Sequence, residues 1–148
     1  MNILDELLGE HAALLTVFEH IEQGAARMSL VELRAAGALL ERVLMTHSIA
    51  EDRHLFDALP PGDAPLDEVL EAMRGEHVQM AQELGQLRDC ESEAAARGCL
   101  ARLIDLAREH FEVEERVLFA QAARHLSAAQ LEELGARWKY QRMREAAS

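Results

Sequence analysis

Apolar residues recur every three or four positions along four long stretches of this chain, and its only prolines, Pro60, Pro61 and Pro65, lie close together. This period places apolar side chains on one face of a helix, whereas proline inside a helix ends or kinks it. The helix-forming residues Ala, Leu and Glu number 25, 23 and 20 of the 148, and aromatic residues make up only 4%. The sequence therefore predicts an all-α protein, because β-sheets favour β-branched and aromatic side chains.

The ends of the periodic stretches predict five helices. We expect them at about 3–24, 29–59, 65–89, 93–125 and, shorter than the others, 127–145. Ser29 and Ser127 each stand three residues before a Glu or Gln, which is typical of a helix start, and Pro65 suits a first helical turn. Short connections make consecutive helices antiparallel. The prediction is a single domain over 1–148, with an up-down-up-down four-helix bundle at about 2–125 and an appended C-terminal helix.

The net charge of the chain limits the kinds of molecule that it can bind. Lys and Arg total 15 against 27 Asp and Glu, and this net charge of −12 would repel nucleic acid and anionic membranes. The N-terminal segment MNILDELLGEH has neither a basic region nor a long apolar run. We therefore expect no secretory signal, no transmembrane helix and a cytoplasmic location.

The two cysteines of the chain carry little information by themselves. Cys90 and Cys99 are too few for a disulfide framework and too far apart for a CxxC metal or redox site. We interpret them as thiols of a loop region, with a reversible disulfide as the alternative.

An internal repeat divides the chain into two similar halves. The tripeptide GEH occurs at 9–11 and again at 75–77, an offset of 66 positions. The segment HSIAEDRHLF at 47–56 matches HFEVEERVLF at 110–119, an offset of 63 positions. The two halves are therefore the same helical hairpin written twice.

Six polar residues of this repeat are candidates for one shared site. They are His11, His47, Glu51, His77, His110 and Glu114. Counting from the expected helix ends places all six within about 10 Å of a common level of the bundle, at roughly 1.5 Å per residue. In the second and fourth helices the His precedes the Glu by four residues, so both side chains project from the same face.

The chemistry of these six residues points to a metal. Imidazole nitrogens and carboxylate oxygens inside a helical bundle suit iron, with manganese or zinc as alternatives, and two facing carboxylates can bridge a pair of ions. Without a metal, six such groups in an apolar interior would be costly to bury.

Other interpretations of single histidines remain open at this level. An isolated His on a helix is usually a surface residue, and a His–Glu pair at four-residue spacing is often only a stabilising contact. We assign His20 to the solvated face, because it lies nine positions from His11, and His125 to the helix dipole. His54 returns to nearly the same face as His47, which leaves a role at the edge of the site open.

The ordered pattern of the six residues resembles the hemerythrin-like family of HHE cation-binding domains. In that family, the first and third helices each supply a His, and the second and fourth helices each supply an HxxxE motif. The resemblance implies a non-haem di-iron centre, bridged by oxo or hydroxo. It further implies that Glu51 and Glu114 bridge the ions. The terminal ligands it implies are His11 and His47 on one iron, and His77 and His110 on the other.

One position departs from the oxygen-carrying members of that family. Those proteins have a second His four residues after the first in the third helix, where this chain has Ala81. The departure resembles bacterial stand-alone members associated with oxygen or nitric oxide sensing, peroxide handling, or iron delivery. We therefore expect a di-iron protein that binds or reacts with oxygen, nitric oxide or peroxide in sensing or stress response.

Two other classes of protein compete with this interpretation. Ferritin-like iron-storage or ferroxidase proteins use an ExxH motif in each half, and Glu51 with His54 satisfies it once, but Glu114 is followed by Val117. An iron donor would use the same ligands. A metal-free structural bundle leaves the six clustered polar residues unexplained.

Overall fold

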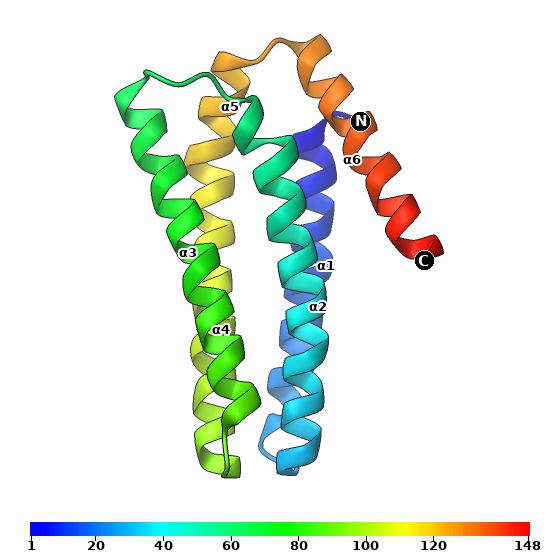
Figure 1. Cartoon of the computed structure of the whole chain (residues 1–148), viewed down its shortest axis with the longest axis vertical. Coiled ribbons are helices and arrows are strands. Elements are labelled where there is room, and N and C mark those ends of the chain that lie inside the picture. Colours follow the sequence, from blue (N-terminus) through cyan, green and yellow to red (C-terminus); the bar gives the residue numbers. More distant parts are fainter.

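The chain forms a helical bundle, described by a computed structural model that covers residues 1–148 and contains no strand. The long helices of the bundle lie side by side, each antiparallel to the one before it (Figure 1). They are α1 (Ile3–Ala25), α2 (Leu30–His54), α3 (Ala64–Asp89) and α4 (Glu93–Val113). A π-helical turn, η2 (Glu114–Leu118), and α5 (Phe119–His125) continue α4, and α6 (Ala128–Ala147) follows. The all-α prediction of a four-helix bundle with a C-terminal helix is confirmed.

Side-chain caps fix where the helices begin. Ser127 and Gln130 form the reciprocal capping box at the start of α6, as expected. Ser29 caps α2 by accepting a hydrogen bond from the Glu32 amide at 3.3 Å. Asp63 caps α3, whose first turn contains Pro65. These starts agree with the sequence because a cap is a local interaction between neighbouring residues.

Two helix ends differ from the prediction. α2 ends at His54, before the expected position 59, and a 3-10 turn, η1 (Phe56–Ala58), follows. The apolar pattern continues through this turn, but Leu59 is extended because it precedes Pro60. The predicted fourth helix is interrupted at Glu114, whose turn has the wider π-helical hydrogen bonding. Such π-turns are frequent at functional sites.

The core consists of two apolar clusters separated by a polar layer. Leu14, Phe18, Leu44, Met80 and Leu103 belong to one cluster, which fills the end of the bundle where α1 joins α2 and α3 joins α4. The other cluster, at the opposite end, includes buried residues of α6 as well as of the bundle. The helices α1, α2 and α3 pass from one cluster to the other through the polar layer, and α4 does so through its continuation in η2 and α5. No helix is long and apolar enough to cross a lipid bilayer.

The C-terminal helix packs against the start of the chain. Figure 1 shows α6 beside the N-terminus, with its C-terminal half diverging from the bundle. A Cβ atom at Gly135 would lie only 2.6 Å from the carbonyl oxygen of Met1, so glycine permits the close approach of the two backbones. Trp138, one turn further along α6, is almost completely buried.

Candidate metal centre

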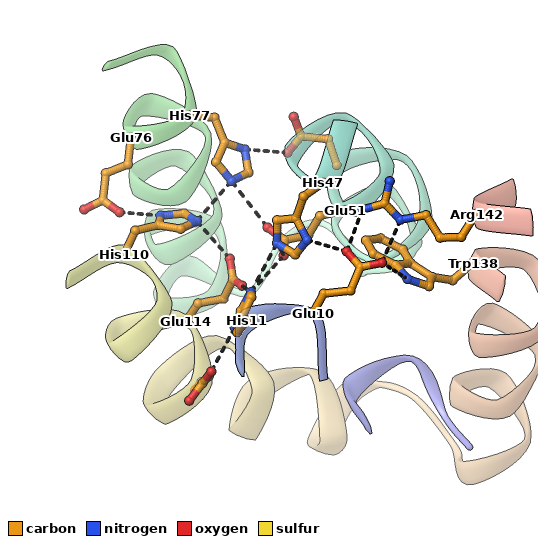
Figure 2. Close-up of polar contacts among 12 residues, drawn as sticks. Glu10, His11, His47, Glu51, Glu76, His77, His110, Glu114, Trp138 and Arg142 are labelled. Atoms are coloured by element: carbon orange, nitrogen blue, oxygen red, sulfur yellow. Dashed lines mark hydrogen bonds and ion pairs between the residues drawn. The ribbon is translucent and has the colours of Figure 1, made fainter. Parts of the chain in front are cut away.

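The six candidate residues meet in the polar layer between the two apolar clusters. Figure 2 shows their imidazoles and carboxylates pointing toward one another from α1, α2, α3, α4 and η2. None of the six side chains is more than 7% exposed. The structure thus brings together His11, His47, Glu51, His77, His110 and Glu114, all from the internal repeat. Whether these residues bind a metal stays a prediction.

The histidines form two pairs. His11 and His47 bring their Nε2 atoms to 3.2 Å, and His77 and His110 bring theirs to 3.0 Å. Each pair joins one His from the first helix of a hairpin to one from the second helix. The pairing therefore repeats in the two halves of the chain.

Glu51 turns one oxygen toward each histidine pair. Its Oε2 lies 3.3 Å from Nε2 of His47, and its Oε1 lies 3.3 Å from Nε2 of His77. Both oxygens are buried and lack a hydrogen bond of normal geometry. An orphaned carboxylate in the protein interior is costly, so these oxygens are suited to a cation.

Glu114, in the second hairpin, also turns one oxygen toward each histidine pair. Its Oε1 lies 3.1 Å from Nε2 of His11, and its Oε2 lies 3.2 Å from Nε2 of His110. Its two oxygens are also buried without a hydrogen bond. The potential ligand atoms thus form two groups of four, each within 4.8 Å of one another, which share Glu51 and Glu114. This donor set fits two cations that share both carboxylates.

A second carboxylate holds the far nitrogen of each histidine. Glu10 accepts from Nδ1 of His47 at 2.8 Å, and Glu76 accepts from Nδ1 of His110 at 2.6 Å. These contacts leave Nε2 directed at the centre, as metal-binding imidazoles require. Both carboxylates are the Glu of a GEH tripeptide, so the repeat contained a signal for them that our sequence analysis did not use.

The residues that follow Glu114 and Glu51 in the sequence supply the other two carboxylates at Nδ1 atoms. With Glu10 and Glu76 they form an outer ring of carboxylates around the histidines. Glu115 contacts Nδ1 of His11 at 2.8 Å, and Asp52 lies 3.3 Å from Nδ1 of His77. These two residues were not predicted from the sequence either. Their signal was the acidic residue at the same place in both copies of the repeat.

The carboxylates change the proton affinity of the imidazoles. Burial lowers the pKa of His47, but the hydrogen bond to Glu10 and the facing carboxylate of Glu51 outweigh burial and raise this pKa to about 9. Carboxylate partners likewise overcome burial to raise the pKa of His77 and of His110 to about 9. For Glu51, burial raises the pKa, but the facing imidazoles of His47 and His77 hold it well below its usual value. Without metal, proton binding by these histidines therefore offsets part of the buried carboxylate charge.

Aromatic rings pack against the imidazoles. Phe111 stacks on His11 with ring centroids 4.0 Å apart, and Phe56 stacks on His77 at 5.7 Å. Trp138 meets His47 edge-on at 5.8 Å. These rings exclude water from the outer side of the cluster and restrict rotation of the imidazoles.

The remaining histidines lie outside the cluster. His20 is exposed, as expected. His125 is the last residue of α5 and lies 3.2 Å from the carboxylate of Asp63. His54 turns toward α6, where it contacts Gln141 and packs against Trp138. It therefore does not supply the ExxH ligand of a ferritin-like site.

Position 81 adds no ligand to the cluster. Ala81 is exposed on α3, and the buried side chain of the same turn is Met80.

The C-terminal helix reaches the outer ring at one point. Trp138 and Arg142 both donate hydrogen bonds to Glu10 (Figure 2). Burial raises the pKa of Glu10, but Arg142 and His47 outweigh burial and lower it to about 2. A cavity of about 690 Å³ between α1, α2 and α6 is lined by Glu10, Leu14 and Arg142, among other residues.

Comparison with known proteins gave one match. The family model described as Hemerythrin HHE cation binding domain matches residues 2–122. No curated protein and no solved structure matches the chain. The matched range contains all six candidate residues and the outer carboxylates, and it excludes α6.

Proposed function

Because the chain belongs to the hemerythrin HHE cation-binding domain family, we propose that its polar layer holds two iron ions and binds or reacts with a small ligand. The ligand class is oxygen, nitric oxide or peroxide. The biological role proposed for this chemistry is sensing or stress response in the cytoplasm.

One observation carries the proposal. Glu51 and Glu114 each direct their two orphaned oxygens at two different histidine pairs. Ion pairs that served stability alone would not require the two oxygens of each carboxylate to face different histidine pairs. A pair of cations, each held by two imidazoles and two shared carboxylates, would satisfy every one of these atoms.

The chemistry of the pair would come from the metal, because bound iron supplies reversible one-electron redox steps and positions for an exogenous ligand. The protein supplies geometry and environment. The outer carboxylates of Glu10, Glu76, Glu115 and Asp52 keep each Nε2 directed inward and raise its basicity as a ligand. The apolar clusters on both sides, together with Phe111 and Phe56, limit access of water and favour a small uncharged ligand.

Iron is favoured over manganese and zinc by the donor set. Imidazole suits iron and zinc, whereas manganese prefers oxygen ligands, and zinc has no redox chemistry to offer a small ligand. The two groups of donors each contain two imidazoles, and they share both carboxylates. This arrangement suits a coupled pair of redox-active ions better than two independent zinc sites.

The test is elemental analysis of protein purified aerobically from iron-replete cells, followed by anaerobic reduction and exposure to each ligand. We expect two irons per chain and near-ultraviolet absorption from the ferric pair. The reduced protein should show a spectral change with at least one of oxygen, nitric oxide and peroxide.

His11→Ala is the site variant and His20→Ala its matched control, because both residues lie on α1 but only His11 joins the cluster. The control should keep the iron content and spectrum of the natural protein. Uptake of many iron ions per chain would favour an iron-storage function. A spectrum that none of the three ligands changes would refute the proposal that the centre binds or reacts with them.

A further inference from the structure

The two cysteines are neighbours in space at the end of the α3–α4 hairpin. Cys90 follows the last residue of α3, and Cys99 lies in the second turn of α4. Their Sγ atoms are 3.6 Å apart, and both thiols are free. The interpretation of both as loop-region thiols is therefore wrong for Cys99, which is buried in a helix.

The local packing holds the two sulfur atoms in this arrangement. Arg34 of α2 donates a hydrogen bond to the carbonyl of Cys90, so the end of α3 is tied to the neighbouring helix. Cys99 is only 5% exposed, and the Nη2 atom of Arg102 lies 3.2 Å from its Sγ. Cys90 is partly exposed. One thiol is thus accessible to a small reagent, and the other faces it from the protein interior.

We propose that Cys90 and Cys99 form a redox-active dithiol that a hydroperoxide converts to an intrachain disulfide. A disulfide needs sulfur atoms about 2.05 Å apart, which small rotations of two adjacent side chains can supply.

The reaction has two balanced steps. The Cys90 thiolate attacks one peroxide oxygen, the O–O bond breaks, and one water leaves after proton transfer, which gives a sulfenic acid. The Cys99 sulfur then attacks the sulfur of Cys90, the S–OH bond breaks, and a second water leaves. Two thiols lose two electrons and two protons, and one hydrogen peroxide is reduced to two waters.

Burial sets the order of the two thiols. Burial and the adjacent Cys90 raise the pKa of the Cys99 thiol, although Arg102 opposes the rise. Cys99 therefore suits the second, intramolecular step, in which its partner is already in contact.

This dithiol is separate from the candidate metal centre. Cys90 lies thirteen residues beyond His77 on α3, or about 20 Å at 1.5 Å per residue. The proposal therefore does not depend on the function proposed for the histidine cluster.

The experiment treats reduced full-length protein with equimolar hydrogen peroxide, alkylates the remaining thiols and measures the intact mass. It is done with metal-free protein in chelator and with iron-loaded protein, because iron can itself generate oxidants. In both forms we expect the two thiols to disappear together, with a mass lower by two hydrogen atoms and a peptide cross-link between Cys90 and Cys99. Alkylation of both thiols after treatment, loss of only one thiol, or a disulfide-linked dimer would overturn the proposal.

Two serine variants test the order of the steps. In Cys99→Ser, the remaining Cys90 should accumulate a sulfenic acid that a dimedone probe traps. In Cys90→Ser, the buried Cys99 should react at least tenfold more slowly with peroxide. Faster oxidation of Cys99 than of Cys90 would contradict the assigned roles.

Discussion

Arg142 binds the carboxylate of Glu10 through two hydrogen bonds, from Nε to Oε1 and from Nη2 to Oε2, each 2.6 Å long. Glu10 in turn accepts the hydrogen bond from Nδ1 of His47, so the C-terminal helix is connected to a candidate ligand through one carboxylate. Its counterpart in the repeat, Glu76, contacts His110 but has no arginine or lysine partner. The appended helix therefore adds a difference between the two halves of the centre.

The first prediction concerns this asymmetry. Arg142→Ala should weaken metal retention at the His11 and His47 pair, because Glu10 loses the group that orients it. Loss of an outer partner of a metal-binding His typically lowers affinity about 10- to 100-fold. A titration with a competing chelator should show one metal ion leaving at lower chelator concentration while the other is little changed.

Arg144→Ala is the matched control, because Arg144 lies on the same helix but is exposed and packs on Tyr140. It should release both ions as the natural protein does. Equal weakening by both variants would mean that α6 acts only through general stability.

A second prediction distinguishes shared from terminal ligands. Glu51→Ala or Glu114→Ala should reduce iron from about two ions per chain to near zero and abolish magnetic coupling, because each carboxylate faces both histidine pairs. His77→Ala removes a residue from only one group and should leave about one ion. Iron analysis with magnetic measurements checks both. A Glu114→Ala protein that keeps a coupled pair would show that the ligands are assigned wrongly.

The six residues of the cluster were predictable because their signal is repeated. A single His or one HxxxE pair has many explanations, but the same types at matched depth in two hairpins restrict them to one centre. The regular rise of an α-helix then converts sequence spacing into height along the bundle. The carboxylates that contact the histidine Nδ1 atoms are also repeated in the two halves. Acidic residues on a helix are usually solvated, however, so the repeat alone did not distinguish them from surface charges.

The contributions of α6 could not be predicted in this way. Trp138 and Arg142 have no counterparts in the repeat, and they meet Glu10 across 128 and 132 residues of sequence. Their contact depends on how α6 packs against α1, which no local pattern encodes. The π-turn at Glu114 was missed for a different reason. The apolar period of the sequence continues through this turn and gives no sign of it.

A third prediction concerns stability. Metal bound only by the folded state stabilises it by about 3 to 4 kcal/mol when free metal exceeds the dissociation constant several hundredfold to a thousandfold. The iron-loaded protein should therefore unfold at a higher temperature than chelator-treated protein. Glu114→Ala should abolish the difference, and His20→Ala should preserve it. Identical midpoints for loaded and metal-free natural protein would refute metal-coupled stability.

The last prediction is that pH acts in opposite directions on the metal-free fold and on metal binding. In the metal-free protein, His47, His77 and His110 have pKa values of about 9, raised above their ordinary value of 6.5. A raised histidine pKa contributes stability that is complete below about pH 6.5 and is lost as pH rises through about 9. The free energy of unfolding of the metal-free protein should therefore fall across this range.

Metal affinity should rise over the same range, because each imidazole must lose its proton before Nε2 can bind an ion. At neutral pH, loading should therefore release a measurable number of protons per chain from the histidines, since Glu51 is already ionised. Calorimetric titration in buffers of different ionisation enthalpy measures this number, and denaturant unfolding at several pH values measures the stability. Metal-free stability that is constant or increases from about pH 6.5 to about pH 9 would contradict the imidazolium–carboxylate pairing, and so would loading without proton release.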